Sequence, residues 1–237
     1  MIPPGKFNAE LFEVEQLLQD CSLLKERNVG NRKRLGAAEL AGLEYKEQWE
    51  KLTKANDYDF KLINDAILSF QLVYESGDVR YVWLESPRVV ETFGDFARGY
   101  VLDVMGVDQL AEPQVEALIE EFTEDITAAY EVRLAESPLK LFVTPLRYEF
   151  HRTGYKKGWH PISHVHVGQN YDIRLGCAHV LTPLAFTLFV MRQMYCEKWK
   201  ELLNSGWALA NRHRAREMCE IPSEFKTDLD CIELWLV

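Results

Sequence analysis

Histidines gather in one stretch of this sequence, with arginines at its two ends. Five of the six histidines fall between positions 151 and 179, and the stretch from Arg147 to Arg174 carries five Lys or Arg against two Asp or Glu. Imidazole exchanges protons near neutral pH and binds metal ions. Guanidinium groups match the oxygens of phosphate. This stretch is therefore the candidate site, and its chemistry would be directed at an anion.

Strand periodicity predicts which of these side chains lie together, since residues two apart on a strand share a face. Three short segments alternate in this way. The polar side chains that share a face are Arg147, Glu149 and His151 in the first segment, His164 and His166 in the second, and Asp172 and Arg174 in the third. If the segments pair as a meander, all of these groups line one face of a sheet. A register slip of one residue would scatter them.

The first functional interpretation is cleavage or binding of a phosphodiester or nucleotide without a cofactor. His164 or His166 would be the acid–base group, and His151 and Glu149 would orient or assist it. The groups expected to hold the substrate are Arg147, Arg174, Lys156 and Lys157. A base, an acid and a cation are about what a metal-independent ribonuclease needs.

A second interpretation is a divalent metal site. His164 and His166 would be two ligands, and His151 or Glu149 would be the third. Arg147 and Arg174 count against this site, because positive charges beside a metal ion are unfavourable unless a substrate anion intervenes. A third interpretation is a face that binds a partner without chemistry. The same pattern also fits histidines that are simply solvated or hydrogen-bonded to carboxylates.

Composition narrows the class of protein. The chain has 237 residues and a formal net charge of −10, which disfavours non-specific wrapping of duplex DNA. Five widely spaced cysteines, an odd number, fit reduced thiols in a cytoplasmic protein. We expect no membrane association, since the most apolar run, 181–190, is shorter than the ~20 residues that span a bilayer.

The elements that must position the candidate site alternate between helical and strand periods. The expected helices cover about 8–24, 37–54, 89–104, 113–134 and 182–206. The expected strands are a hairpin over 68–83, the three segments near 147–153, 162–167 and 172–177, and a last strand over 231–237.

This order predicts one α+β domain over 1–237, built on an antiparallel sheet of about five strands flanked by helices. N-terminal helices would occupy 8–55, the sheet and helical core 66–205, and a C-terminal tail 206–237.

Four motifs together resemble an uncharacterised bacterial family, a domain of unknown function. They are Arg147-Tyr-Glu, His160-Pro-Ile-Ser-His-Val-His-Val-Gly, Ile173-Arg and Thr182-Pro. Members of that family often lie near phage-defence or toxin–antitoxin genes, and small toxin-like proteins share a similar layout. The resemblance implies a bacterial protein and a partner protein encoded nearby. It transfers no residue roles.

These observations combine into one expectation about function. We expect a nucleic-acid or nucleotide-processing component of a bacterial defence or toxin–antitoxin system. The alternatives are a non-catalytic interaction or regulatory subunit of such a system and a histidine-based metal-binding protein.

Overall fold

The computed structural model describes residues 2–28, 34–89, 91–105, 111–169, 173–206 and 219–229. Within these residues the fold is α+β and centres on a seven-stranded antiparallel sheet, whose strands lie in the order of the sequence. The strands are β1 (Leu24–Arg27), β2 (Phe60–Leu62), β3 (Ile67–Leu72), β4 (Val79–Leu84), β5 (Leu146–Phe150), β6 (Ser163–Val167) and β7 (Ile173–Gly176). β8 (His179–Val180) and β9 (Cys219–Glu220) form a separate pair.

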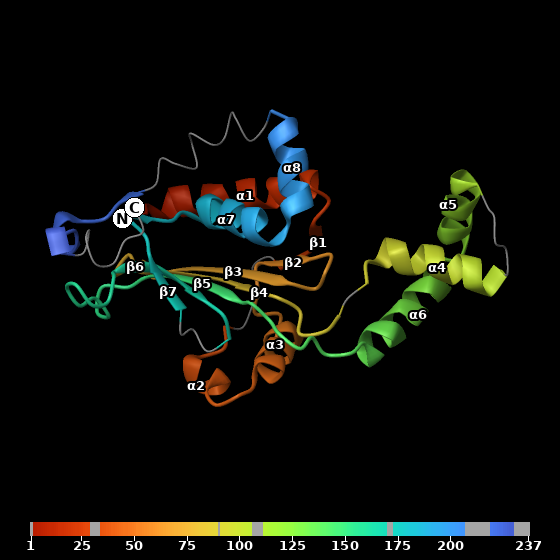
Figure 1. The fold of residues 1–237 in the computed structure, drawn as a ribbon, viewed down its shortest axis with the longest axis horizontal. Helices are drawn as coiled ribbons and strands as arrows, with labels where there is room; N and C mark the ends of the chain where they lie inside the picture. Colours follow the sequence, from red (N-terminus) through yellow and green to blue (C-terminus); the bar gives the residue numbers. More distant parts are fainter. Residues whose placement is uncertain are drawn as a thin grey trace.

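Helices cover both faces of the sheet, and three more stand apart from it (Figure 1). The helices are α1 (Pro4–Asp20), α2 (Ala37–Leu40), α3 (Tyr45–Lys54), α4 (Phe93–Met105), α5 (Glu112–Glu121), α6 (Thr123–Glu136), α7 (Pro183–Met194) and α8 (Cys196–Asn204). α1, α7 and α8 lie over one face, and α2 and α3 lie under the other (Figure 1). None of the described helices is long and apolar enough to cross a membrane.

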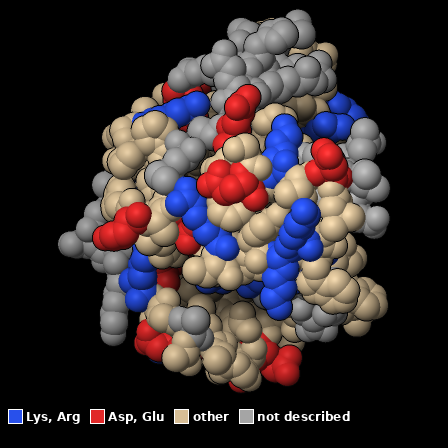
Figure 2. Space-filling model, turned by 90° about the vertical axis from the view of Figure 1, so that its left-hand side faces the viewer, with Lys and Arg blue, Asp and Glu red and all other residues tan. Residues whose placement is uncertain are grey.

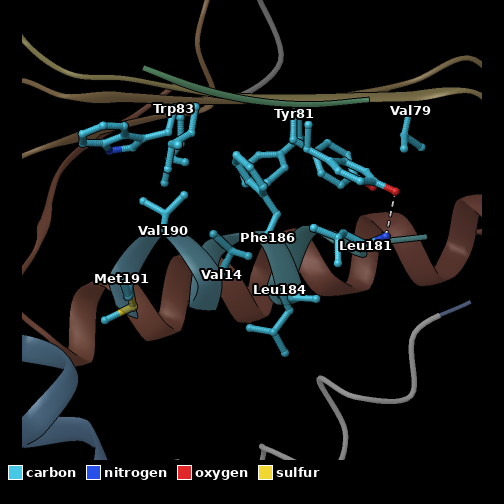
Figure 3. Packing of buried hydrophobic residues seen from close by; sticks show 14 of the residues in the cluster. Val14, Val79, Tyr81, Trp83, Leu181, Leu184, Phe186, Val190 and Met191 are labelled. Atoms are coloured by element: carbon cyan, nitrogen blue, oxygen red, sulfur yellow. Dashed lines mark hydrogen bonds between the residues drawn. The ribbon is translucent and has the colours of Figure 1, made fainter. Parts of the chain in front are cut away.

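The main core lies between the sheet and the helices α1 and α7. Tyr81 and Trp83 on β4 point toward Val14 of α1 and Phe186 of α7 (Figure 3). The ring centroids of Tyr81 and Phe186 are 5.7 Å apart, and both residues are fully buried. Burial of one such side chain stabilises the fold by roughly 1.5–3 kcal/mol. This face of the sheet is therefore fixed by packing. On the other face, Ile67 and Leu84 pack with Tyr45 of α3 in a smaller apolar cluster.

Residues 85–145 leave the sheet at the end of β4 and return at the start of β5. They contain α4, α5 and α6, which we call the helical arm (Figure 1). The arm has a small core of its own around Ala97, Val101 and Ile126. Its two connecting segments lie side by side, since the Val89 amide donates to Pro138 and the Lys140 amide donates to Pro87.

The α+β class, the antiparallel sheet and the 68–83 hairpin are confirmed, but the expected number of strands was too low. β1 and β2 are short, and β1 shows no alternation of buried and exposed residues. Three expected helices are each divided. The segment 37–54 separates into α2 and α3 around Gly42, whose φ is +75°, 113–134 separates into α5 and α6 at Phe122, and 182–206 separates into α7 and α8 at Tyr195. The expected strand over 231–237 lies outside the described residues.

Candidate functional site

Strands β5, β6 and β7 bring five of the predicted polar side chains onto one face, whereas Asp172 lies outside the described residues. Arg147 of β5 pairs with His166 of β6, and His166 pairs with Arg174 of β7. In the next row, Glu149 pairs with His164. Burial in β5 alternates, because its tyrosine and phenylalanine face the core and its charged residues face away. The meander that the alternation predicts is therefore the observed arrangement.

Glu149, His164 and His166, which we call the histidine–glutamate cluster, converge at their side-chain tips. The Nε2 atoms of His164 and His166 are 2.9 Å apart. Oε2 of Glu149 lies 3.8 Å from each of these nitrogens. Among the described residues, these three are the His, Cys, Asp or Glu group with the spacing needed to hold one metal ion.

The two histidines are buried, whereas Glu149 reaches the surface. The side chains of His164 and His166 are 0% and 5% exposed, against 23% for Glu149. Nδ1 of His164 lies 2.9 Å from the carbonyl oxygen of Pro161, so in the neutral ring this nitrogen carries the hydrogen and Nε2 carries the lone pair. Burial, with further contributions from His166 and His160, lowers the pKa of His164 to about 3. His164 is therefore neutral at physiological pH.

Arginines surround this cluster on both sides. The Nε atoms of Arg147 and Arg80 lie 3.3 and 3.7 Å from Oε1 of Glu149, the oxygen that does not face the histidines. Arg174 is exposed on β7 and makes no ion pair with a described residue. The site thus has one carboxylate among three guanidinium groups, an arrangement that favours binding of an additional anion.

His160 joins the site, although the alternation pattern did not select it. Its ring lies edge-on to that of His164, with centroids 4.9 Å apart. Burial, followed by the charge of Arg174, lowers the pKa of His160. Its Nδ1 is buried without a hydrogen-bond partner in the described part of the chain. The signal in the sequence was its place at the start of the His-Pro-x-x-His-x-His motif.

Comparison with known proteins places the sequence in a family. A sequence model described as an uncharacterized conserved protein, DUF2290, matches residues 17–228. The chain belongs to the DUF2290 family. The match includes all strands of the main sheet and therefore the whole candidate site. No curated protein and no solved structure matches this DUF2290 chain.

Three residues that the sequence grouped with the site lie outside the cluster. His151 follows the last residue of β5, and its Nε2 is 2.9 Å from the Thr153 hydroxyl and 4.0 Å from Oδ2 of Asp78. Lys156 and Lys157 are exposed in the segment between β5 and β6, and neither has an ion pair with a described residue. The sequence left open whether His151 or Glu149 would be the third ligand beside His164 and His166. In the structure, Glu149 holds that position.

A cavity of about 100 Å³ lies on the same sheet face, toward α2 and α3. Its lining includes Gln71 and Arg80 from the sheet and Gln48 from α3. Arg80 also contacts Glu149, so the cavity and the histidine–glutamate cluster share a wall. α2 and α3 therefore bound one side of the polar face, a role that their sequence did not indicate.

The surface near this end of the sheet carries charges of both signs. Figure 2, viewed from the side where β6 and the 151–161 segment lie in Figure 1, shows Lys and Arg side chains with Asp and Glu among them. A duplex backbone needs a continuous basic surface to neutralise its many phosphates. A mixed surface with a local group of arginines is better suited to a small number of phosphates.

Proposed function

We propose that the polar face of β5–β7 binds and cleaves a phosphate-bearing substrate, a nucleotide or a short segment of nucleic acid. The strand register supports this proposal most directly. It puts Arg147 and Arg174 on either side of His166, in the row next to Glu149 and His164. Guanidinium groups on both sides of acid–base groups can hold the phosphoryl oxygens while a bond to phosphorus breaks.

The exposure of the side chains suggests how the roles divide. Arg174 is exposed and would contact the substrate first, and Arg147 would contact it from the other side of the cluster. Solvent reaches the cluster at Glu149, whose side chain is 23% exposed. Glu149 would therefore be the member of the cluster nearest the substrate or an attacking water, and His164 and His166 would act behind it.

The cellular setting that we propose is the cytoplasm of a bacterium, in a defence or toxin–antitoxin system. The support for this setting is the resemblance of the four motifs, from Arg147-Tyr-Glu to Thr182-Pro, to a family found near such genes. A partner protein encoded nearby belongs to the same proposal.

A non-catalytic interaction subunit is the second candidate, and exposed apolar side chains support it. Leu141 and Phe142, at the base of the helical arm, are 92% and 87% exposed. Adjacent exposed apolar residues of this size often mark a surface that a partner covers. In this case the polar face would bind an anion without catalysing a reaction.

Arginine variants test the proposed function. The purified protein is incubated with short single-stranded RNA and with nucleoside triphosphates, with and without added divalent ions, and binding and product formation are measured. We expect Arg174→Gln and Arg147→Gln to weaken binding about 10- to 100-fold, since a charged hydrogen bond contributes about 1.5–3 kcal/mol.

Arg98→Gln is the matched control, because Arg98 lies on the helical arm in an exposed ion pair with Glu112. This variant should bind and cleave like the wild type. Binding that depends on Arg174, without product under any condition, would favour the interaction subunit. If neither substrate class binds, or if all three variants behave alike, the proposed function is wrong.

A further inference from the structure

We propose that Glu149, His164 and His166 bind one divalent transition-metal ion of the Zn²⁺ class. The three ligand atoms form a triangle with sides of 2.9, 3.8 and 3.8 Å. A single point lies about 2.1 Å from all three atoms of such a triangle, which matches ordinary Zn–N and Zn–O distances. By distance the three atoms can share an ion, and the two nitrogens would move slightly apart to reach a tetrahedral angle.

The hydrogen bond to Pro161 prepares His164 for this role. A histidine binds a metal ion through the lone pair of a neutral ring. The contact of 2.9 Å between Nδ1 and the Pro161 carbonyl leaves that lone pair on Nε2, the nitrogen that faces Glu149 and His166. A backbone carbonyl behind a histidine ligand also fixes the orientation of its ring. Pro161 is thus a positioning group for the metal ligand.

Three protein ligands would leave positions on the ion open for water or substrate. The nearby His160 has a buried Nδ1 without a hydrogen-bond partner among the described residues. A buried polar atom of this kind is costly unless it meets a partner. The ring of His160 contacts that of His164, so His160 lies next to the proposed metal site.

The arginines around the cluster explain why an anion and a metal ion would bind together. Arg147 and Arg80 contact Oε1 of Glu149, and Oε2 remains directed at the histidines. One carboxylate does not balance a divalent ion beside these guanidinium groups. A phosphate oxygen on an open metal position would supply the missing negative charge. The use of the ion in catalysis rests on the proposed function, whereas its binding rests on the geometry alone.

The alternative is a pair of histidines joined by a hydrogen bond. Without an ion, the contact of 2.9 Å between the two Nε2 atoms requires a hydrogen on one of them. Since His164 already carries its hydrogen on Nδ1, His166 would donate. The two cases differ in whether the protein takes up metal, so direct metal binding distinguishes them.

The test uses the full chain without a histidine tag, stripped with a chelator and then titrated with Zn²⁺ and with Co²⁺. We expect one ion per chain, visible absorption bands from bound Co²⁺, and a raised unfolding temperature. Glu149→Gln, His164→Gln and His166→Gln should each weaken binding by at least about 100-fold, more than the loss of an outer partner costs. His151→Gln, the same change outside the cluster, should bind like the wild type.

Failure to bind Zn²⁺ or Co²⁺ stoichiometrically by folded wild-type protein would overturn the metal site and leave the hydrogen-bonded pair. Equal binding by wild type and Glu149→Gln would also overturn it; this variant keeps the test decisive if the buried histidine variants do not fold. Metal binding together with unchanged substrate binding in Arg174→Gln would refute the proposed function alone. Arginine-dependent substrate binding without any metal uptake would refute the metal site alone.

Discussion

Ser163, the residue before His164, is held by a chain of hydrogen bonds that runs in one direction. The Leu181 amide donates to the Tyr148 hydroxyl over 2.8 Å. Oγ of Ser163 donates to the His179 carbonyl over 2.7 Å, so the Tyr148 hydroxyl must donate to Ser163, 2.9 Å away. Tyr148 and Ser163 are both buried to 0% exposure. These hydrogen bonds thus join β5 and β6 directly behind the histidine–glutamate cluster.

Tyr148→Phe should lower the free energy of unfolding by about 1–3 kcal/mol, because it leaves the buried Leu181 amide without its acceptor. Urea unfolding at neutral pH measures this change. Tyr74→Phe is the control, since Tyr74 is 61% exposed, and it should change stability by less than about 0.5 kcal/mol. Equal stability of Tyr148→Phe and the wild type would show that water replaces the hydroxyl.

The alternation of side chains along a strand explains for which site residues the sequence predicts the position correctly. Arg147, Glu149, His164 and His166 lie within strands, where an alternating pattern fixes the face that each side chain takes. His151 lies one residue beyond β5, where the chain turns and the alternation no longer applies. His160 lies in the segment before β6, and only the folded chain brings its ring to His164.

At the scale of elements, Tyr195 attaches the junction of α7 and α8 to the sheet. Its hydroxyl donates to Oδ1 of Asn64 over 3.1 Å and accepts from the Trp83 indole over 3.4 Å. Burial raises the pKa of Tyr195 to about 12, although the hydrogen bond that the Trp83 indole donates to the hydroxyl opposes the shift. The folded state therefore keeps this proton at a pH where the unfolded chain has lost it.

The stability that Tyr195 contributes should be complete below pH 10 and decline as the pH rises from 10 to 12. In that window the unfolded state binds fewer protons than the folded state, so the free energy of unfolding falls with pH. Tyr195→Phe should show a decline smaller by about 1–2 kcal/mol. Urea unfolding at pH 8 and pH 11 gives both values, and parallel declines for wild type and variant would contradict the assignment.

Local signals explain which elements the sequence could place. Thr182 caps α7 by accepting from the Ala185 amide, and Pro183 follows at a favoured first position. The sequence alone therefore predicts where α7 begins, because both signals are local. β1 contains Leu-Lys-Glu-Arg and is a strand because β2 pairs with it, with an irregular register near Leu24. Pairing of this kind leaves no periodic signal in the chain.

At the scale of the whole molecule, the helical arm is joined to the sheet by two adjacent segments. The Lys140 amide donates to the Pro87 carbonyl over 2.8 Å, so the entering and leaving chains already meet. Between the arm and the sheet lies a cavity of about 540 Å³, lined by Lys25 and Ile63 on one side and by Phe93 and Tyr130 on the other. Packing between the two parts is therefore sparse there.

Replacement of residues 88–139 by an Asn-Gly turn should leave the sheet folded, since a two-residue turn suffices for chains that already meet. We expect cooperative unfolding and Zn²⁺ binding within about threefold of the full chain, because the metal ligands lie on β5 and β6. Thermal unfolding and metal titration measure both. A chain that fails to fold would show that the arm is part of the structural core.

The position of the arm also affects the order in which the sheet can form. Every other pair of neighbouring strands from β2 to β7 is joined by a shorter connection than the arm, whereas β4 and β5 pair across residues 85–145. Closing a longer loop loses more chain entropy, and contacts between distant residues form more slowly. Glu149 and His164 belong to the local hairpin of β5 and β6, so the proposed ligands can meet before the sheet is complete. Arg80 would reach Glu149 only when the two halves of the sheet join.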